Sequence, residues 1–161
     1  MNAPLSIRFA EERDLDTILF FIRALADYEH AAEEVLATTD ILKESLFRRK
    51  MAEVLLGEWE GKPVCFALFC HNFSTWLGVP GIHLEDLFVL EEYRGHGFGR
   101  QMLRRLAQVA LERGCGRLEW ACLDWNTPSI AFYRDVMHAQ PLDEWTTYRL
   151  TGETLKALAG E

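Results

Sequence analysis

The stretch that decides the fold runs from Tyr93 to Glu112 and reads YRGHGFGRQMLRRLAQVALE. It places Gly95, Gly97 and Gly99 directly before a segment whose apolar residues recur at helical spacing, which predicts a helix just after the glycines. A helix N-terminus has unpaired N–H groups and a partial positive charge. Glycines without a Cβ atom let an anion approach these groups closely. We therefore interpret the stretch as an anion-binding turn, with Arg94 as an added cation.

Two widespread phosphate-binding motifs do not fit this turn. A Rossmann-type G-x-G-x-x-G would need glycine at position 100, where Arg100 stands. A P-loop would need a lysine after its last glycine, and none follows here. The pattern that remains is R-G-x-G-x-G, between a strand-like run ending near Leu90 and the helix. A merely flexible turn would explain one glycine, but not three beside an arginine.

The composition predicts one globular domain over residues 1–161. Hydrophobic residues make up 49% and charged residues 26%, an ordinary balance for a packed core. The apolar runs are too short for a bilayer and the N-terminus does not resemble a signal peptide, so we expect a cytoplasmic protein with no membrane partner. The net charge of −8 argues against nucleic acid as a partner. It permits a small cationic substrate, although by itself the charge is explained better by solubility.

The cysteines and histidines show no metal-ligand spacing. None of the four cysteines forms a C-x-x-C, so we expect reduced thiols and no bound metal.

The whole chain alternates strand-like and helix-like patterns. The expected strands are 5–10, two runs joined by a hairpin at Glu60-Gly61-Lys62, 81–90, 116–125 and 144–152. The expected helices are 11–30, 38–49, the one after the glycines, one that Asn126 caps with Pro128 in its first turn, and 152–160. This order predicts a mixed α/β sheet with helices packed against it.

Several segments of the chain, and the order of its expected elements, resemble the GCN5-related N-acetyltransferases, the GNAT superfamily. RGHGFG matches the signature Q/R-x-x-G-x-G/A, and LEDLFVLEEYRG and LDWNTPSIAFY match flanking segments of the family. The resemblance narrows to the diamine and polyamine subgroup, the spermidine/spermine type, on the segments LADYEHAAEEV, LEDLFV, YRGHGFG and WNTPSIAFY. The resemblance implies a mostly antiparallel central sheet splayed between two strands, a homodimer, and acetyl transfer from acetyl-CoA to a small-molecule amine.

The resemblance also implies where acetyl-CoA binds. Its pyrophosphate would lie on the N–H groups of the glycine turn, its pantetheine arm along the preceding strand, and a third contact at the start of the helix after Asn126. The implied cofactor residues are Leu87, Phe88, Val89, Arg94, Gly95, His96, Gly97, Phe98, Gly99, Arg100, Asn126, Pro128 and Ser129.

Two catalytic residues follow from the resemblance. Tyr133 stands where the family has the general acid beside the CoA sulfur, a role that a phenol can fill. Glu85 stands where the family has a glutamate that acts as base, through water. Adjacent strand residues point to opposite faces, so Glu85 and Asp86 share a face only if a bulge re-aims them. We favour Glu85, and a bulge would also let the N–H of Leu87 polarise the thioester carbonyl.

The substrate residues that the resemblance implies are Tyr28, Glu29, Trp76, Glu85, Asp86, Glu119 and Trp120. For Trp76, packing at the sheet edge is an equal alternative, and for Tyr28 and Glu29 a solvated helix terminus is. Ser74 replaces the acid that the subgroup has two residues before this tryptophan, which shifts weight from long polyamines towards short diamines and lysine-like amino acids. Met137 replaces a usual glycine after Tyr133. The competing functions are a peptide or protein N-acetyltransferase and a non-catalytic CoA-binding module.

Overall fold

The structure is a computed structural model that describes residues 4–161. The chain divides between Ala121 and Cys122 into two compact units, and each is described by itself. The single domain expected over residues 1–161 stays a prediction. No helix among the described residues is long and apolar enough to cross a membrane.

The first unit is built on one sheet of five strands in the order β1-β2-β3-β4-β5. The strands are β1 (Ser6–Phe9), β2 (Glu53–Trp59), β3 (Lys62–Ser74), β4 (Val79–Val89) and β5 (Leu118–Trp120). The first four pair antiparallel, and β5 pairs parallel to β4. This confirms the mixed, mostly antiparallel sheet.

The sheet splays where β4 and β5 part. Their pairing covers Ile82 to Leu84 on β4 and ends there, whereas β4 continues to Val89. Within the described chain, the last five residues of β4 therefore have a strand on the β3 side alone. The predicted pantetheine segment, 87–89, lies in this unpaired part.

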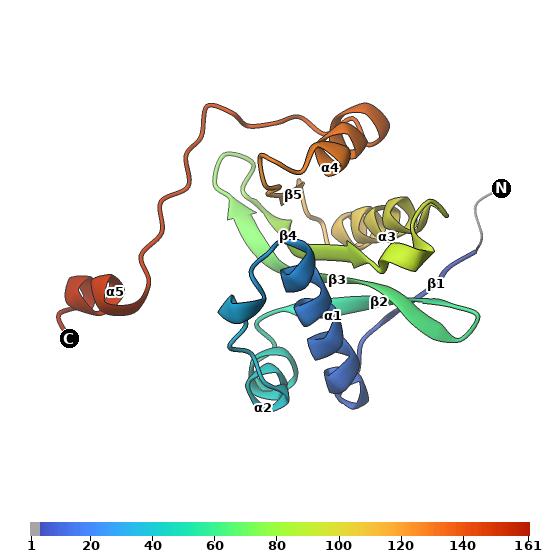
Figure 1. Ribbon diagram of the computed structural model, residues 1–161. Coiled ribbons are helices and arrows are strands. Elements are labelled where there is room, and N and C mark those ends of the chain that lie inside the picture. The colour runs from blue at the N-terminus through green and yellow to red at the C-terminus, as the bar shows by residue number, and fades with distance from the viewer. Residues whose placement is uncertain (1–3) are drawn as a thin grey trace. The chain divides into compact units, whose positions relative to one another are not determined.

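Helices cover both faces of this sheet, as Figure 1 shows: α1 (Leu15–Tyr28) and α2 (Thr39–Leu42) lie on one face and α3 (Phe98–Glu112) on the other. The 3-10 turns are η1 (Glu12–Asp14), η2 (Ala32–Glu34) and η4 (Glu91–Tyr93), and α2 continues into the π turn η3 (Lys43–Arg48). We call the two sides of the sheet the α1 face and the α3 face.

Aromatic and aliphatic side chains fill the core under the α1 face. Phe21 of α1 is fully buried and stacks on Phe66 of β3 with ring centroids 5.2 Å apart. Leu68 and Phe88 pack into the same cluster. Burial of one such side chain stabilises the fold by about 1.5–3 kcal/mol, so this core holds α1 firmly on β3 and β4.

The hairpin predicted at Glu60-Gly61 is confirmed. Trp59 pairs with Lys62, and the two residues between them have positive φ angles of 51° and 76°. That is the backbone of a two-residue type I′ turn.

The second unit contains α4 (Thr127–Ala131), the π turn η5 (Phe132–Val136) and α5 (Gly152–Ala159). Two strand predictions need correction here. The strand expected over 116–125 is only Leu118–Trp120, and the one expected over 144–152 is wrong, because no strand forms there. A β pattern becomes a strand only when its N–H and C=O groups find a partner strand, and the described part of this unit offers none.

Candidate active site

A bulge in β4 lies at the two predicted acids. Leu68 of β3 pairs with Asp86, but the next residue, Phe69, pairs with Leu84, so Glu85 is an extra residue on β4. An extra residue of this kind breaks the alternation of the strand and re-aims its side chain. The bulge that the sequence required for two adjacent acids on one side is therefore present.

The neighbours of these acids show which face they share. Cys70 and Leu68, two residues apart on β3, pair with His83 and Asp86, which places all four on the α1 face. The His83 Nε2 atom lies 3.2 Å from an oxygen of Glu85, which brings Glu85 to the same side. The two acids thus lie together on one face.

Three carboxylates interact at this point. Burial, and then the charges of Glu85 and Glu29, raise the pKa of Asp86 to about 6. Burial also raises the pKa of Glu29, at the end of α1, whereas the Glu85 side chain is 60% exposed. Ionised carboxylates in this arrangement destabilise one another, and an ammonium group placed among them relieves the repulsion. A carboxylate with a pKa near 6 is also a suitable proton acceptor near neutral pH.

Arg94 links the glycine turn to β4 and to the end of α1. Its guanidinium lies 4.8 Å from the ring centre of Tyr28 and 5.2 Å from that of Phe88. Its Nε donates a hydrogen bond of 3.1 Å to the carbonyl of Val89. A cation over two aromatic rings stabilises both ring positions. Arg94 therefore contacts the predicted pantetheine strand and a predicted substrate residue at once.

The glycine turn has the form of an anion-binding helix start. Gly97 is the N-cap of α3 with a φ of 77°, and Gly95 has a φ of 80°, so both conformations favour glycine. Gly99 has no such backbone requirement, and a Cβ atom there would meet only Val89 Cγ2, at 3.9 Å. The fold itself does not need a glycine at position 99. A ligand that approaches the backbone would need one.

The side chains of His96 and Phe98 pack within the glycine turn and against the β2–β3 hairpin. The Nδ1 atom of His96 lies 3.1 Å and 3.0 Å from the carbonyl oxygens of Tyr93 and Arg94. The ring stacks on Phe98 at 5.4 Å, and Trp59 of the β2–β3 hairpin packs on both. These contacts favour a structural role for the two side chains, and the cofactor contact of this segment stays a prediction. Leu87 and Arg100 lie at the two ends of the predicted cofactor segment, on β4 and in the first turn of α3.

The second unit holds the remaining predicted residues. Asn126 caps α4 as predicted, with its Oδ1 accepting a bond of 3.4 Å from the N–H of Ser129, and Pro128 lies in the first turn. Tyr133 lies in η5. Met137 replaces the usual glycine, and the left-handed conformation in this turn is taken by the next residue, His138, with a φ of 56°. The roles of these residues at the cofactor stay predictions.

The predicted substrate residues on the outer strands differ in exposure. Trp76, between β3 and β4, is 97% exposed, so the packing alternative is wrong. Trp120 pairs with Leu84 on β4. Glu119 accepts a hydrogen bond of 2.6 Å from Asn72, and Arg117 Nε lies 3.6 Å from the same oxygen. The sequence interpretation missed these last two neighbours, although Arg117 and Glu119 have the i, i+2 spacing that shares a strand face.

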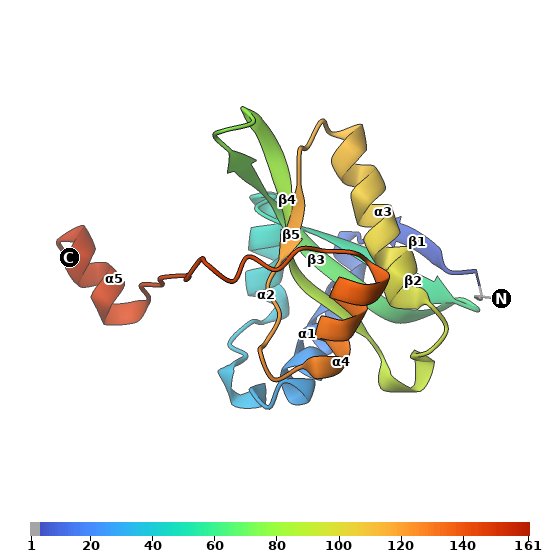
Figure 2. The ribbon, with the colours of Figure 1, turned by 90° about the horizontal axis from the view of Figure 1, so that it is seen from above.

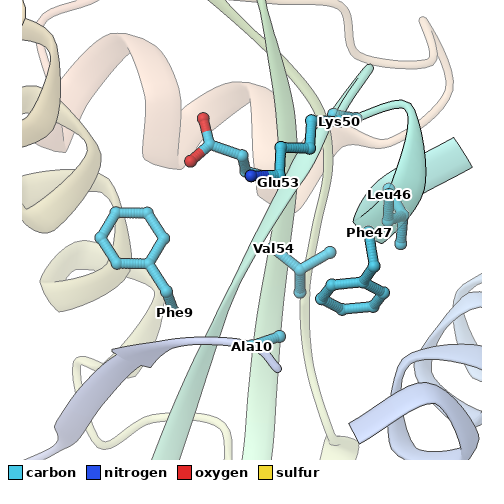
Figure 3. Close-up of a pocket in the computed structure, with 8 residues that line it drawn as sticks. Phe9, Ala10, Leu46, Phe47, Lys50, Glu53 and Val54 are labelled. Carbon is cyan, nitrogen blue, oxygen red and sulfur yellow. The ribbon is translucent and has the colours of Figure 1, made fainter. Parts of the chain in front are cut away.

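A cavity of about 370 Å³ lies in the first unit where β1 ends and β2 begins (Figure 3). It has two charged lining residues, Lys50 and Glu53, and Glu53 is held by Arg113 through bonds of 2.5 and 2.9 Å. None of the predicted site residues lines this cavity. No group of three metal-ligating side chains occurs within residues 4–161.

Comparison with known proteins identifies the family of the chain. Residues 12–138 match the sequence model of the acetyltransferase (GNAT) family. The thialysine N-epsilon-acetyltransferase of Bos taurus is 36% identical, over 99% of both chains. The spermidine/spermine N(1)-acetyltransferase-like protein 1 of Homo sapiens is 30% identical, over 96% of this chain and 24% of that protein.

One solved structure extends the agreement to the fold. An integron cassette protein from the mobile metagenome of V. cholerae superposes with a TM-score of 0.81 at 25% identity, over 99% of both chains. The chain belongs to the GNAT family and is an acetyl-CoA-dependent N-acetyltransferase.

Proposed function

We propose that the protein acetylates a primary amine of a small, extended cation: a diamine, a polyamine or a lysine-like amino acid. The observation that carries the proposal is a group of three acids on the α1 face. The β4 bulge brings Glu85 and Asp86 together there, and the charge of Glu29, at the end of α1, acts on Asp86. Such a group attracts an ammonium and accepts its proton. The thialysine and spermidine/spermine names of the relatives are consistent with this substrate class.

The acids act first on the amine. An ammonium cannot attack a thioester until it loses a proton, and either Glu85, through water, or Asp86 takes that proton. The family resemblance favours Glu85 as the proton acceptor, whereas the raised pKa of Asp86 favours Asp86 in that role. The neutral amine then attacks the thioester carbonyl carbon directly. The C–N bond forms as the C–S bond breaks, and the nitrogen then releases one further proton, which restores through solvent the proton that Tyr133 gives to the thiolate.

Other residues of the chain assist at the two ends of the reacting bond. The backbone N–H of Leu87, which follows the bulge on β4, polarises the thioester carbonyl. Tyr133 gives its proton to the departing CoA thiolate. The glycine turn and Arg94 hold the diphosphate of the co-substrate, and Asn126 contacts it near the start of α4.

A homodimer is part of the proposal. Every residue from 140 to 161 is exposed, and these include large apolar side chains: Leu142, Trp145, Tyr148, Leu150, Leu155 and Leu158. So much exposed apolar surface marks an interaction site, and a second copy of the chain is the occupant that the resemblance implies. Trp145→Glu should shift the protein towards monomer in sedimentation velocity.

The experiment that tests the activity is thiol release from acetyl-CoA with a panel of amines. Diamines and lysine analogues should react faster than hexylamine or an N-terminally free peptide. Glu85→Gln, Asp86→Asn and Tyr133→Phe should each reduce kcat. Fast reaction with the peptide alone would favour a protein acetyltransferase, and no thiol release with any amine would favour a CoA-binding module.

A further inference from the structure

We propose that Arg117, Glu119 and Asn72 form a subsite for the α-amino-acid head group of a substrate whose distal amine is acetylated. The proposal rests on the proposed function, because it assumes that the distal amine reaches Glu85 and Asp86. It narrows the substrate class from extended cations in general to basic amino acids. The argument uses only residues of the first unit.

The three side chains lie on the same face as the acids. Glu119 of β5 is paired with His83 of β4, the residue whose ring contacts Glu85. Asn72 of β3 lies four residues beyond Leu68 on the α1 face, and its amide donates to Glu119. Figure 2 shows β5 running alongside β4. One polar row thus runs across the three strands, from the acids to Glu119 and Asn72.

The length of this row suits a lysine-like substrate. The three residue steps from His83 to Asp86 span at most roughly 10 Å at about 3.3 Å per step, and the bulge shortens this distance. An extended lysine side chain places its terminal nitrogen about 6–7 Å from its α-carbon, with C–C bonds of about 1.5 Å. The carboxylate and ammonium groups on the α-carbon add to this length. With its distal amine at Glu85 and Asp86, a lysine molecule can therefore place its α-carbon groups beside Glu119, which pairs with His83.

Gly81 of β4 leaves room for the side chains of Asn72 and Arg117. A Cβ atom on Gly81 would lie 2.5 Å from Asn72 Oδ1 and 2.7 Å from Arg117 Cγ, so only glycine allows the two side chains to lie over β4. Asn72 Oδ1 and Arg117 Nε are buried and have no hydrogen-bond partner among the described residues. Arg117 Nη2 donates a hydrogen bond of 3.0 Å to the carbonyl of Phe73, which fixes the guanidinium beside Glu119. Buried polar atoms are nearly always paired, so the two unpaired atoms leave hydrogen-bonding capacity that a bound head group would fill once Asn72 and Arg117 turn towards it.

The charges of the subsite select a zwitterion over a bare ammonium. The positive charge of Arg117 lies beside the negative charge of Glu119, and both side chains are 37% exposed. An α-carboxylate can bind the guanidinium while the α-ammonium binds Glu119. The second ammonium of a diamine gains Glu119 but is repelled by Arg117. The subsite therefore discriminates between two substrates that differ by one carboxylate.

The test compares L-lysine with cadaverine, which is lysine without that carboxylate. Arg117→Met should raise the KM for lysine by about ten-fold or more, because a charge-assisted contact is lost, and should leave the KM for cadaverine unchanged or lower it. Glu119→Gln should raise both KM values. Arg104→Met, which removes an exposed arginine of α3 outside the site, is the matched control and should change neither.

The outcomes separate this proposal from the proposed function. If the wild type acetylates no amine, the proposed function fails. If it acetylates cadaverine but not lysine, or if Arg117→Met changes the two KM values equally, the head-group subsite is overturned and the acetyltransferase assignment stands. Thermal unfolding of each variant shows whether the fold is intact, and Arg117→Lys should restore part of the lysine KM if the first variant unfolds early. Mass spectrometry of the product should place the acetyl group on the distal nitrogen.

Discussion

Replacing Asp86 with asparagine should stabilise the protein and impair its chemistry. The pKa of Asp86 is about 6 rather than the ordinary 3.8, chiefly because the carboxyl is buried. At about 1.4 kcal/mol for each ten-fold change in the protonation equilibrium, ionising this group in the folded state costs up to about 3 kcal/mol. Partial exposure screens some of that cost, so we expect a gain of about 1–3 kcal/mol from Asp86→Asn at pH 8.

The sign of the effect depends on pH. Between about pH 4 and 6 the folded protein retains the Asp86 proton that the unfolded chain has lost, so this group makes wild-type stability fall as the pH rises through that window. The difference between variant and wild type should therefore be small at pH 4, grow to pH 6 and stay constant above it. The assay is thermal unfolding of both proteins across this range, with a predicted increase of about 2–10 °C in Tm at pH 8.

Glu92→Gln is the matched control for this experiment, since Glu92 is an exposed acid of η4 that lies outside the site. It should show no such pH-dependent gain. Activity supplies a second measurement: in the wild type, kcat/KM for the amine should fall as the pH drops below about 6, where Asp86 becomes protonated. An asparagine variant that is no more stable than wild type at pH 8, or equally stabilised at pH 4 and pH 8, would refute the reasoning.

Three further predictions test other parts of the site. Gly99→Val should weaken acetyl-CoA binding in calorimetry by ten-fold or more, because its side chain fills the space that the phosphate would occupy. Tm should change little, because the added Cβ would contact only Val89 Cγ2, at an ordinary 3.9 Å. Unchanged affinity would show that the phosphate does not bind at this turn. Tyr133→Phe should lower kcat by about 10²-fold with little change in the KM for acetyl-CoA, and a loss of only a few-fold would make Tyr133 a packing residue. Glu29→Gln should raise the KM of a diamine more than that of hexylamine, and the diamine KM of the wild type should rise with salt; salt-independent values would contradict an acidic amine site.

The glycine turn and the strand before it could be predicted because their determinants are local. Positive φ angles at Gly95 and Gly97 and the helical spacing after Phe98 are encoded within a few residues. The same holds for the Asn126 cap and the hairpin at Glu60-Gly61.

Other features depend on partners far along the chain. Glu85 and Asp86 share a face only because of the bulge, and the bulge depends on the register with β3, whose Leu68 lies 17 residues before Glu85 in the chain. Asn72 and Arg117 meet only because β3, β4 and β5 are adjacent. The strand expected over 144–152 failed for the same reason, since its pattern is right but its pairing partner is absent from the described unit.

The central claim is that an acid cluster on the α1 face receives one end of an extended, doubly charged amine. The most direct test measures kcat/KM for L-lysine, cadaverine and hexylamine in the thiol-release assay at low and high salt, with wild type and Glu85→Gln. We predict that lysine and cadaverine exceed hexylamine at least ten-fold at low salt, that the advantage shrinks at high salt, and that Glu85→Gln lowers all three rates. Equal rates for the three amines, unaffected by salt and by Glu85→Gln, would contradict the account.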